Sequence, residues 1–338
     1  MVLDLACWGF GLSRVMLPPV HGVRESLFDK YGIAYLGWLF DQPCHQQLTG
    51  VMASKHYAIY PDLGHAQQVR LMYHDLRLSG ELFQPPAVRL ENDFATLDWM
   101  ASRPIDVLYV GNLDSKALQC QWRDRAEPQR PSSFDPRFCE ALAAARLSEP
   151  DLSLHVSLQQ VISTFQVSPQ VFNIRFHASL VEDFVRHLYR RNVVIALARS
   201  GIQLHIVGNG WGRIELPANV TVVPAVDYEG MFRLAAQAKI CLDASTYLDG
   251  VNDRAFSYAL NRSVCFTNAA GYLKGAVGEE GGMHFYSMGN LDRLCDEVSE
   301  LLAKPRTLRD LGEQAGLTVR SAHTWPQRIG SILSTVVR

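Results

Sequence analysis

The densest set of side chains that could do chemistry lies in a polar loop within residues 240–268. The apolar run Ile240–Leu242 predicts a strand before it, and Val264–Phe266 predicts a strand after it. A short helix is expected to start near Asn252 or Asp253, either of which can cap it. The polar residues of this loop are Asp243, Ser245, Asp249, Asn252, Asp253 and Arg254.

The neighbouring Asp253 and Arg254 can hold hydroxyls with one side chain and phosphate with the other. In an α/β sheet, ligands bind outside the carboxyl ends of the strands, where helix N-termini point free N–H groups. The loop therefore predicts half of a nucleotide-sugar site. The plainer alternative is that Asp253 caps the helix while Arg254 makes a surface salt bridge.

Two further strand ends carry glycines, which permit a tight turn and close approach of a ligand to the backbone. One follows the apolar run 105–110, and the other follows the run 203–207. The alternative interpretations are a plain glycine turn at each strand end and, for Lys116, a solvated surface side chain. Together with the turn after 220–223, these ends supply the candidate donor-binding residues Gly111, Asn112, Lys116, Gly208, Asn209, Gly210 and Pro224.

A possible general base follows a buried, aromatic-rich strand expected over 33–40. Asp41 and His45 come directly after it, and either can take a proton from an acceptor hydroxyl. A capping Asp41 and a hydrogen-bonded surface His45 form the alternative interpretation. His21, in a loop of the same region, is a second-rank candidate for the base.

Composition excludes several function classes. The net charge of -2 over 338 residues gives no indication of a nucleic-acid partner. No apolar run approaches the roughly 20 residues that span a bilayer, and the N-terminus makes a poor secretory signal. The seven cysteines are scattered, which favours a reduced, cytoplasmic setting and argues against a structural zinc site.

Strands alternate with helices over more than two hundred residues, which predicts a doubly wound parallel sheet. A long helix is expected over 179–200, with Ser179 as its cap, Glu182 completing a capping box and Gly201 ending it. Asp227 is expected to cap the helix that follows the strand at 220–223. The Gly-x-Gly-x-x-Gly fingerprint is missing after the first strand, which argues against a nicotinamide-dependent oxidoreductase.

Several motifs together resemble the C-terminal part of group 1 glycosyltransferases, most closely the CgeB-like branch. They are LHIVGNGW, VTVVPAVDYEGMFRLAAQAKICLDAS and NDRAFSYALNRSVCFTNAAGYL. Upstream, YGIAYLGWLFDQPCH and DVLYVGNL are similar to the aromatic strand of that branch and to the strand opening its second domain. The resemblance extends from about residue 30 to residue 330 and is strongest over 203–273.

The resemblance implies a GT-B fold, in which two Rossmann-like domains face each other across a cleft. The expected domains are a shortened acceptor-side domain over 1–102, a nucleotide-sugar domain over 103–322, and a C-terminal helix over 323–338 that packs back on the first domain. The resemblance also implies a nucleotide-sugar donor and no cofactor or metal ion, because helix dipoles and basic side chains neutralise the diphosphate.

For individual residues, the resemblance implies that Arg254 and the amides after Gly111 stabilise the leaving diphosphate, while Asp253 holds the ribose. Many relatives carry Glu-x7-Glu where this chain has Asp249 and Ser257, and Ser257 lacks the two acceptor oxygens of a carboxylate. Asn268, after the strand at 264–266, completes the candidate donor site.

The expected activity is transfer of a sugar to an acceptor hydroxyl, with Asp41 or His45 as the base. The stereochemistry and the acceptor (a glycan, a lipid-linked glycan or a protein) stay open. The alternative function is a catalytically silent GT-B-like protein that binds a nucleotide or a partner.

Overall fold

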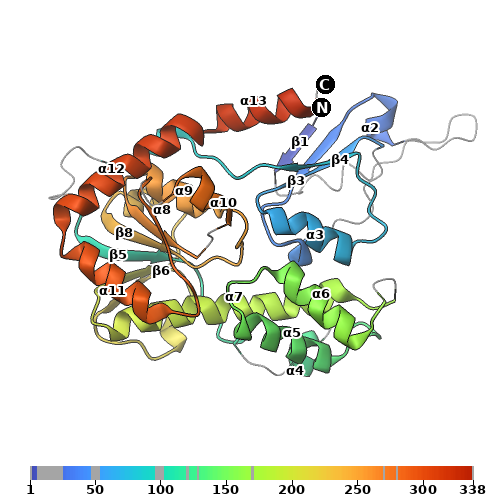
Figure 1. Cartoon of the computed structure of the whole chain (residues 1–338), viewed down its shortest axis with the longest axis horizontal. Coiled ribbons are helices and arrows are strands. Elements are labelled where there is room, and N and C mark those ends of the chain that lie inside the picture. Colours follow the sequence, from blue (N-terminus) through green and yellow to red (C-terminus); the bar gives the residue numbers. More distant parts are fainter. Residues whose placement is uncertain are drawn as a thin grey trace, which may run out of the picture.

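A computed structural model gives the structure of this protein. It describes residues 2–5, 26–46, 54–95, 103–118, 122–127, 129–168, 171–268, 271–278 and 281–336. Two parallel sheets lie side by side, each with its own helices (Figure 1). We call the part around the four-stranded sheet the first lobe and the part around the six-stranded sheet the second lobe. None of the described helices is long and apolar enough to cross a membrane.

The first lobe contains four parallel strands in sequential order. The strand expected over 33–40 is present, while the last strand of this sheet was not predicted, because two prolines follow it closely and obscure its pattern. The strands are β1 (Val2–Leu5), β2 (Tyr35–Trp38), β3 (His56–Tyr60) and β4 (Gly80–Phe83), with helices α2 (Leu27–Lys30) and α3 (Leu63–Met72) and the short helices η1 (Pro43–His45) and η2 (Leu90–Asn92). His21 lies outside the described residues.

The second lobe contains six parallel strands in the order β10-β9-β8-β5-β6-β7, which confirms the doubly wound sheet. The strand order reverses between β5 and β8, and such a reversal opens a crevice at the carboxyl ends of the two strands. The six strands of this sheet are β5 (Ile105–Val110), β6 (Leu204–Val207), β7 (Val220–Val223), β8 (Ala238–Asp243), β9 (Val264–Thr267) and β10 (Met283–Phe285).

Helices cover both faces of the six-stranded sheet, and its central strands are therefore continuous apolar runs in the sequence. Along β5, Val107 and Tyr109 enter one core while Leu108 enters the other. The first core is closed by α7 (Ile174–Arg199) and α11 (Leu291–Leu302), and the second by α8 (Tyr228–Ala235), α9 (Asp253–Leu260) and α12 (Pro305–Ala322). The short helices α10 (Gly271–Ala276) and η3 (Trp211–Arg213) complete this lobe.

A helical segment is inserted between β5 and α7 and lies below α3 in Figure 1. It consists of α4 (Trp122–Ala126), α5 (Pro136–Ser148) and α6 (Leu154–Phe165). The expected start of α7 was wrong, because Asn173 caps it by accepting from the amide of Phe176. Glu182 does not complete a capping box but pairs with the buried Arg146, with 2.8 Å between carboxylate oxygen and Nε.

The chain crosses between the lobes near Val88 and again near Thr324. The two crossings are hydrogen-bonded to each other, since the amides of Val88 and Trp325 bond the carbonyls of His323 and Val88. The second crossing leads into α13 (Trp325–Val336), which runs along the first sheet (Figure 1). There the ring of Trp325 lies 5.4 Å from that of Trp38, edge to face.

Candidate active site

A cavity of about 430 Å³ opens between the lobes at the point where the strand order of the second sheet reverses. We call it the first cavity. Both lobes contribute to its wall, so it faces a cleft rather than a single sheet edge. Its lining residues are Phe40, Asp41, Pro61 and Pro86 from the first lobe and Gly111, Asn112, Arg190, Tyr247, Val251, Asn252, Asp253 and Arg254 from the second.

Arg254 is fixed in this wall by contacts with its own lobe. Its Nη1 donates to the carbonyl of Val110 at 2.5 Å, and its Nη2 lies 3.6 Å from a carboxylate oxygen of the fully buried Asp243. Burial alone would lower the pKa of Arg254, but the Asp243 carboxylate raises that pKa above its usual range. The side chain stays 17% exposed, so a guanidinium that is always charged faces the cavity.

Arg190 reaches the same cavity from the middle of α7. Its Nη1 donates to the carbonyl of Asn112 at 3.1 Å, and it forms no ion pair with any described carboxylate. Burial, together with the positive charge of Arg254, lowers the pKa of Arg190. Sequence reasoning missed Arg190, because an arginine inside a helix gives no local indication that it faces a cleft.

Asn252 and Asp253 hold the start of α9 against the cavity. Asn252 caps the helix by accepting from the amide of Arg254 at 3.2 Å, which settles the open choice between the two candidate caps. Asp253 is therefore free of the capping role, and its carboxylate receives a long 3.5 Å contact from the hydroxyl of Tyr228. The cleft walls limit water around its carboxylate and raise the pKa of Asp253.

Asp41 stands on the opposite wall, from the first lobe, and its side chain is exposed to the cleft. Both of its neighbours bond to the loop after β8. The Phe40 carbonyl accepts from the Tyr247 hydroxyl at 2.6 Å, and the Gln42 amide donates to the Thr246 carbonyl at 3.0 Å. Asp41 is thus held across the cavity from the second lobe.

His45, the other candidate base, does not line the first cavity. Its Nδ1 lies 3.0 Å from the hydroxyl of Ser179 on α7. Burial and the charge of Arg186 lower the pKa of His45. The residue expected to cap α7, Ser179, is instead the partner of this imidazole.

The glycine-containing strand ends pack against each other. A Cβ at Gly208 would lie 2.3 Å from the Gly111 carbonyl oxygen, and one at Gly210 would lie 1.8 Å from that of Leu113. Gly210 also has φ +88°, which favours glycine. These glycines let the turn after β6 lie on the turn after β5, where Asn112 accepts from the Asn209 amide at 2.8 Å.

Of these strand ends, only Gly111 and Asn112 line the first cavity. Pro224 and Lys116 are exposed outside it, and the backbone amide of Lys116 bonds Asp114. Ser257 is fully buried inside α9, where its hydroxyl donates to the Asp253 carbonyl at 2.9 Å. The side chain of Ser257 is thus engaged within its own helix.

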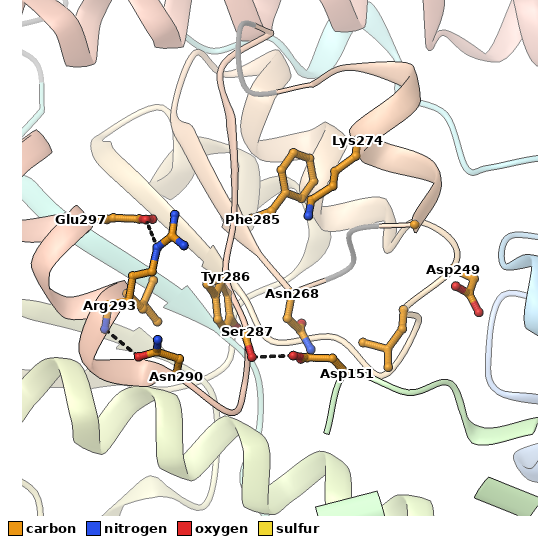
Figure 2. Close-up of a pocket in the computed structure, with 13 residues that line it drawn as sticks. Asp151, Asp249, Asn268, Lys274, Phe285, Tyr286, Ser287, Asn290, Arg293 and Glu297 are labelled. Carbon is orange, nitrogen blue, oxygen red and sulfur yellow. Dashed lines mark hydrogen bonds and ion pairs between the residues drawn. The ribbon is translucent and has the colours of Figure 1, made fainter. Parts of the chain in front are cut away.

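Asp249 and Asn268 line a different cavity, of about 360 Å³, which we call the second cavity (Figure 2). Figure 2 shows Asp249 at one side of this cavity and Lys274 beside the ring of Phe285. Asn268 braces the wall, since its side-chain oxygen and nitrogen bond the amide and carbonyl of Ser245. The polar loop therefore separates two cavities instead of facing one.

The family model described as "Glycosyl transferase-like" matches residues 185–334. This region, which includes Arg190 and Arg254, is therefore a glycosyltransferase-like domain. A search of curated proteins finds no match.

Several solved structures are similar to the whole chain. HepE of Anabaena, in complex with UDP and glucose, has 11% identity and a TM-score of 0.51, covering 92% of this chain and 73% of that one. The DNA-modifying enzyme beta-glucosyltransferase has 9% identity and a TM-score of 0.51, covering 90% and 74%. An alpha-glucosyltransferase with UDP and a 13-mer DNA has 10% identity and a TM-score of 0.51, covering 95% and 78%. The chain has the GT-B fold that these glycosyltransferases share.

Proposed function

We propose that this protein is a glycosyltransferase that moves a sugar from a nucleotide-sugar to an acceptor hydroxyl. The observation that carries the proposal is the pair Arg190 and Arg254, which line one cavity at the strand reversal and face Asp41 across it. The glycosyltransferase-like match over 185–334 and the similar structures in complex with UDP support this choice of reaction. The shared motifs favour the CgeB-like branch of group 1 glycosyltransferases.

In the proposed complex, the diphosphate lies between Arg190 and Arg254. Two guanidinium groups supply two positive charges and planar sets of donors that suit phosphate oxygens. They would stabilise the negative charge that develops on the leaving diphosphate, so we propose that transfer needs no metal ion. Asp253, which lines the cavity and does not cap the helix, would accept from hydroxyls of the ribose or of the sugar.

Asp41 is the proposed general base. It faces the arginines from the opposite wall of the same cavity, whereas His45 bonds Ser179 outside it. A base on the acceptor side can take the proton of the attacking hydroxyl as the bond to the anomeric carbon forms.

One observation favours the second candidate function, a catalytically silent protein that binds a nucleotide or a partner. Ser257 stands where many relatives carry a glutamate, and it is buried and bonded to the Asp253 carbonyl. This protein would then lack one of the carboxylates that hold the nucleotide-sugar in many relatives. Binding without turnover would distinguish this function from the enzyme.

Isothermal titration with UDP, GDP and dTDP tests the proposal, followed by hydrolysis or transfer assays with the matching nucleotide-sugar. We expect one nucleotide to bind and its sugar to be released or transferred. Failure of all three to bind at millimolar concentration would contradict the glycosyltransferase and the nucleotide-binding form of the silent protein. Binding with no release of sugar to water or to any offered acceptor would favour the silent protein.

A further inference from the structure

Backbone groups of the two lobes meet between the two cavities. Pro61–Gly64 of the first lobe lies against Asp249–Val251 of the second, and we call this contact the clasp. The Val251 amide donates to the Pro61 carbonyl at 3.1 Å, and the Leu63 amide approaches the Asp249 carbonyl at 3.5 Å. Residues 62 and 250 form an antiparallel bridge between the lobes.

Asp62 binds both sides of the clasp with one carboxylate. Its Oδ1 accepts from the Gly64 amide at 2.7 Å, which caps α3 in the first lobe. Its Oδ2 accepts from the Asp249 amide at 3.0 Å, which belongs to the second lobe. Asp62 is only 2% exposed, and a buried carboxylate that receives two N–H groups is strongly oriented.

Gly250 makes the close approach possible. A Cβ there would lie 2.2 Å from the Pro61 carbonyl oxygen and 2.5 Å from the Asp62 Cα. Both are backbone atoms, so neither can swing aside as a long side chain could. The clasp can close in this form only with glycine at this position.

The clasp leads directly into the first cavity. Pro61 and Val251 line that cavity, and Asn252, the next residue, caps the helix that carries Arg254. We propose that Asp62 is a positioning residue for the proposed transfer reaction, because its bonds across the clasp set the second-lobe loop at a fixed distance from the Asp41 wall. This inference rests on the proposed function.

The groups around Asp62 make the clasp sensitive to pH. Burial and the nearby Asp249 carboxylate raise the pKa of Asp62 to about 7, although its backbone hydrogen bonds oppose the rise. Burial lowers the pKa of His65 to about 3 and also lowers that of His155, so neither imidazole offers a compensating charge at neutral pH. Burial raises the pKa of the Tyr247 hydroxyl, so it stays neutral.

Proton linkage determines whether the closed clasp becomes more or less stable as the pH rises. An opened clasp would hydrate Asp62 and return its pKa toward about 3.9, so closing binds a proton between these two values. Closure is therefore most stable at low pH and weakens as the pH rises through about 7. Replacing Asp62 by Asn removes this dependence, while Asn still caps α3 well.

Amide hydrogen exchange and kinetics on the full chain test the inference, with the variants Asp62→Asn and Gly250→Ala. We expect the protection factors of the amides at 249 and 251 to fall about tenfold or more in both variants. In the wild type, the same protection should fall as the pH rises from about 4 to about 7 and then level off, and Asp62→Asn should abolish that trend. Turnover should fall about 10- to 100-fold, since small displacements at reacting atoms have such effects, while the affinity for the nucleotide stays within about twofold.

Two matched controls accompany these variants. Asp135 caps α5 by accepting from the Arg137 amide at 2.9 Å, far from the clasp, so Asp135→Asn should change neither exchange at the clasp nor turnover. A methyl group added at Gly330 on α13 would meet open space, so Gly330→Ala controls for the glycine change.

Unchanged protection at 249 and 251 in both variants would overturn the clasp, whatever the activity. Reduced protection with unchanged turnover, or an equal loss of turnover and nucleotide affinity, would overturn the positioning role. A wild-type protein that neither binds a nucleotide nor releases sugar would refute the proposed function and with it the positioning role. The exchange measurement would then still decide whether Asp62 holds the lobes together.

Discussion

The two cavities on either side of the clasp are similar in size but differ in how their charges are satisfied. In the first, Arg190 has no ion pair with a described residue, and Arg254 has only the buried Asp243 at 3.6 Å. In the second, Arg293 pairs with Glu297 at 2.7 Å, and Asp151 accepts from the Ser287 hydroxyl and the Met288 amide.

This difference shows why a polar lining alone is a poor guide to an anion site. The second cavity is rich in charged groups, yet the only arginine among its described lining residues, Arg293, already forms an ion pair with Glu297. The first cavity is lined by two guanidinium groups, and Arg190 has no ion pair with a described residue, so a diphosphate could bind there.

The largest effect is expected at Asp41. Replacing it by Asn removes the proposed base, so turnover should fall about 10²- to 10⁴-fold while the affinity for the nucleotide is unchanged. Steady-state kinetics and calorimetry measure the two quantities. His45→Gln, outside the cavity, should change turnover by less than about threefold. A larger loss in the His45 variant than in the Asp41 variant would reverse the assignment of the base.

The next largest effect is expected at Arg254. Its removal takes away a charged hydrogen bond to phosphate, so Arg254→Ala should weaken nucleotide binding about 10- to 150-fold. It also leaves the buried Asp243 without its partner, which should lower the free energy of unfolding by about 3–5 kcal/mol.

The double variant Arg254→Ala with Asp243→Asn separates these two effects. Asn cannot carry the unpaired charge, so thermal unfolding should return toward that of the wild type while binding stays weak. Recovery of nucleotide binding in the double variant would show that Arg254 acts only on the fold.

A smaller effect is expected at Arg190. Arg190→Ala should weaken nucleotide binding about tenfold, because a single partly exposed guanidinium is lost. Arg199 is exposed near the end of the same helix, so Arg199→Ala is a matched control. This control variant should bind the nucleotide like the wild type. Calorimetry at two salt concentrations measures the effect, and equal affinities for the two variants would exclude Arg190 from the phosphate site.

The smallest effect is expected in the second cavity. Lys274 lies 5.7 Å from the centre of the Phe285 ring and lines only that cavity, so Lys274→Ala should leave the nucleotide affinity within about twofold. The same titration as for Arg190 provides the measurement. A tenfold loss would mean that the donor extends past the clasp into both cavities.

The sequence predicts most of the fold, because strands and helices leave local patterns. The sheet of the second lobe and the cap at Asp227 are present as expected. Asp41 and Arg254, two of the candidate site residues, line the same cavity. Both residues follow strand ends, one in each sheet, and the two ends face each other across the cleft.

The remaining features depend on contacts between distant segments. Arg190 enters the site because α7 runs beneath the sheet, and Asp249 leaves it because the clasp turns its loop toward the other cavity. Ser179 carries a typical capping pattern, but Asn173 begins the helix earlier and places Ser179 beside His45. Such outcomes follow from packing, which no short stretch of sequence encodes.

The anchoring of Arg254 has a consequence for the energetics of any ligand that reaches it. Its guanidinium is already held by the Val110 carbonyl and by Asp243, so the side chain has lost most of its rotamer freedom before binding. Immobilising a long side chain at a binding site typically costs about 0.5–1.5 kcal/mol of conformational entropy. Folding has already met that cost here, so a ligand meets a preorganised charge.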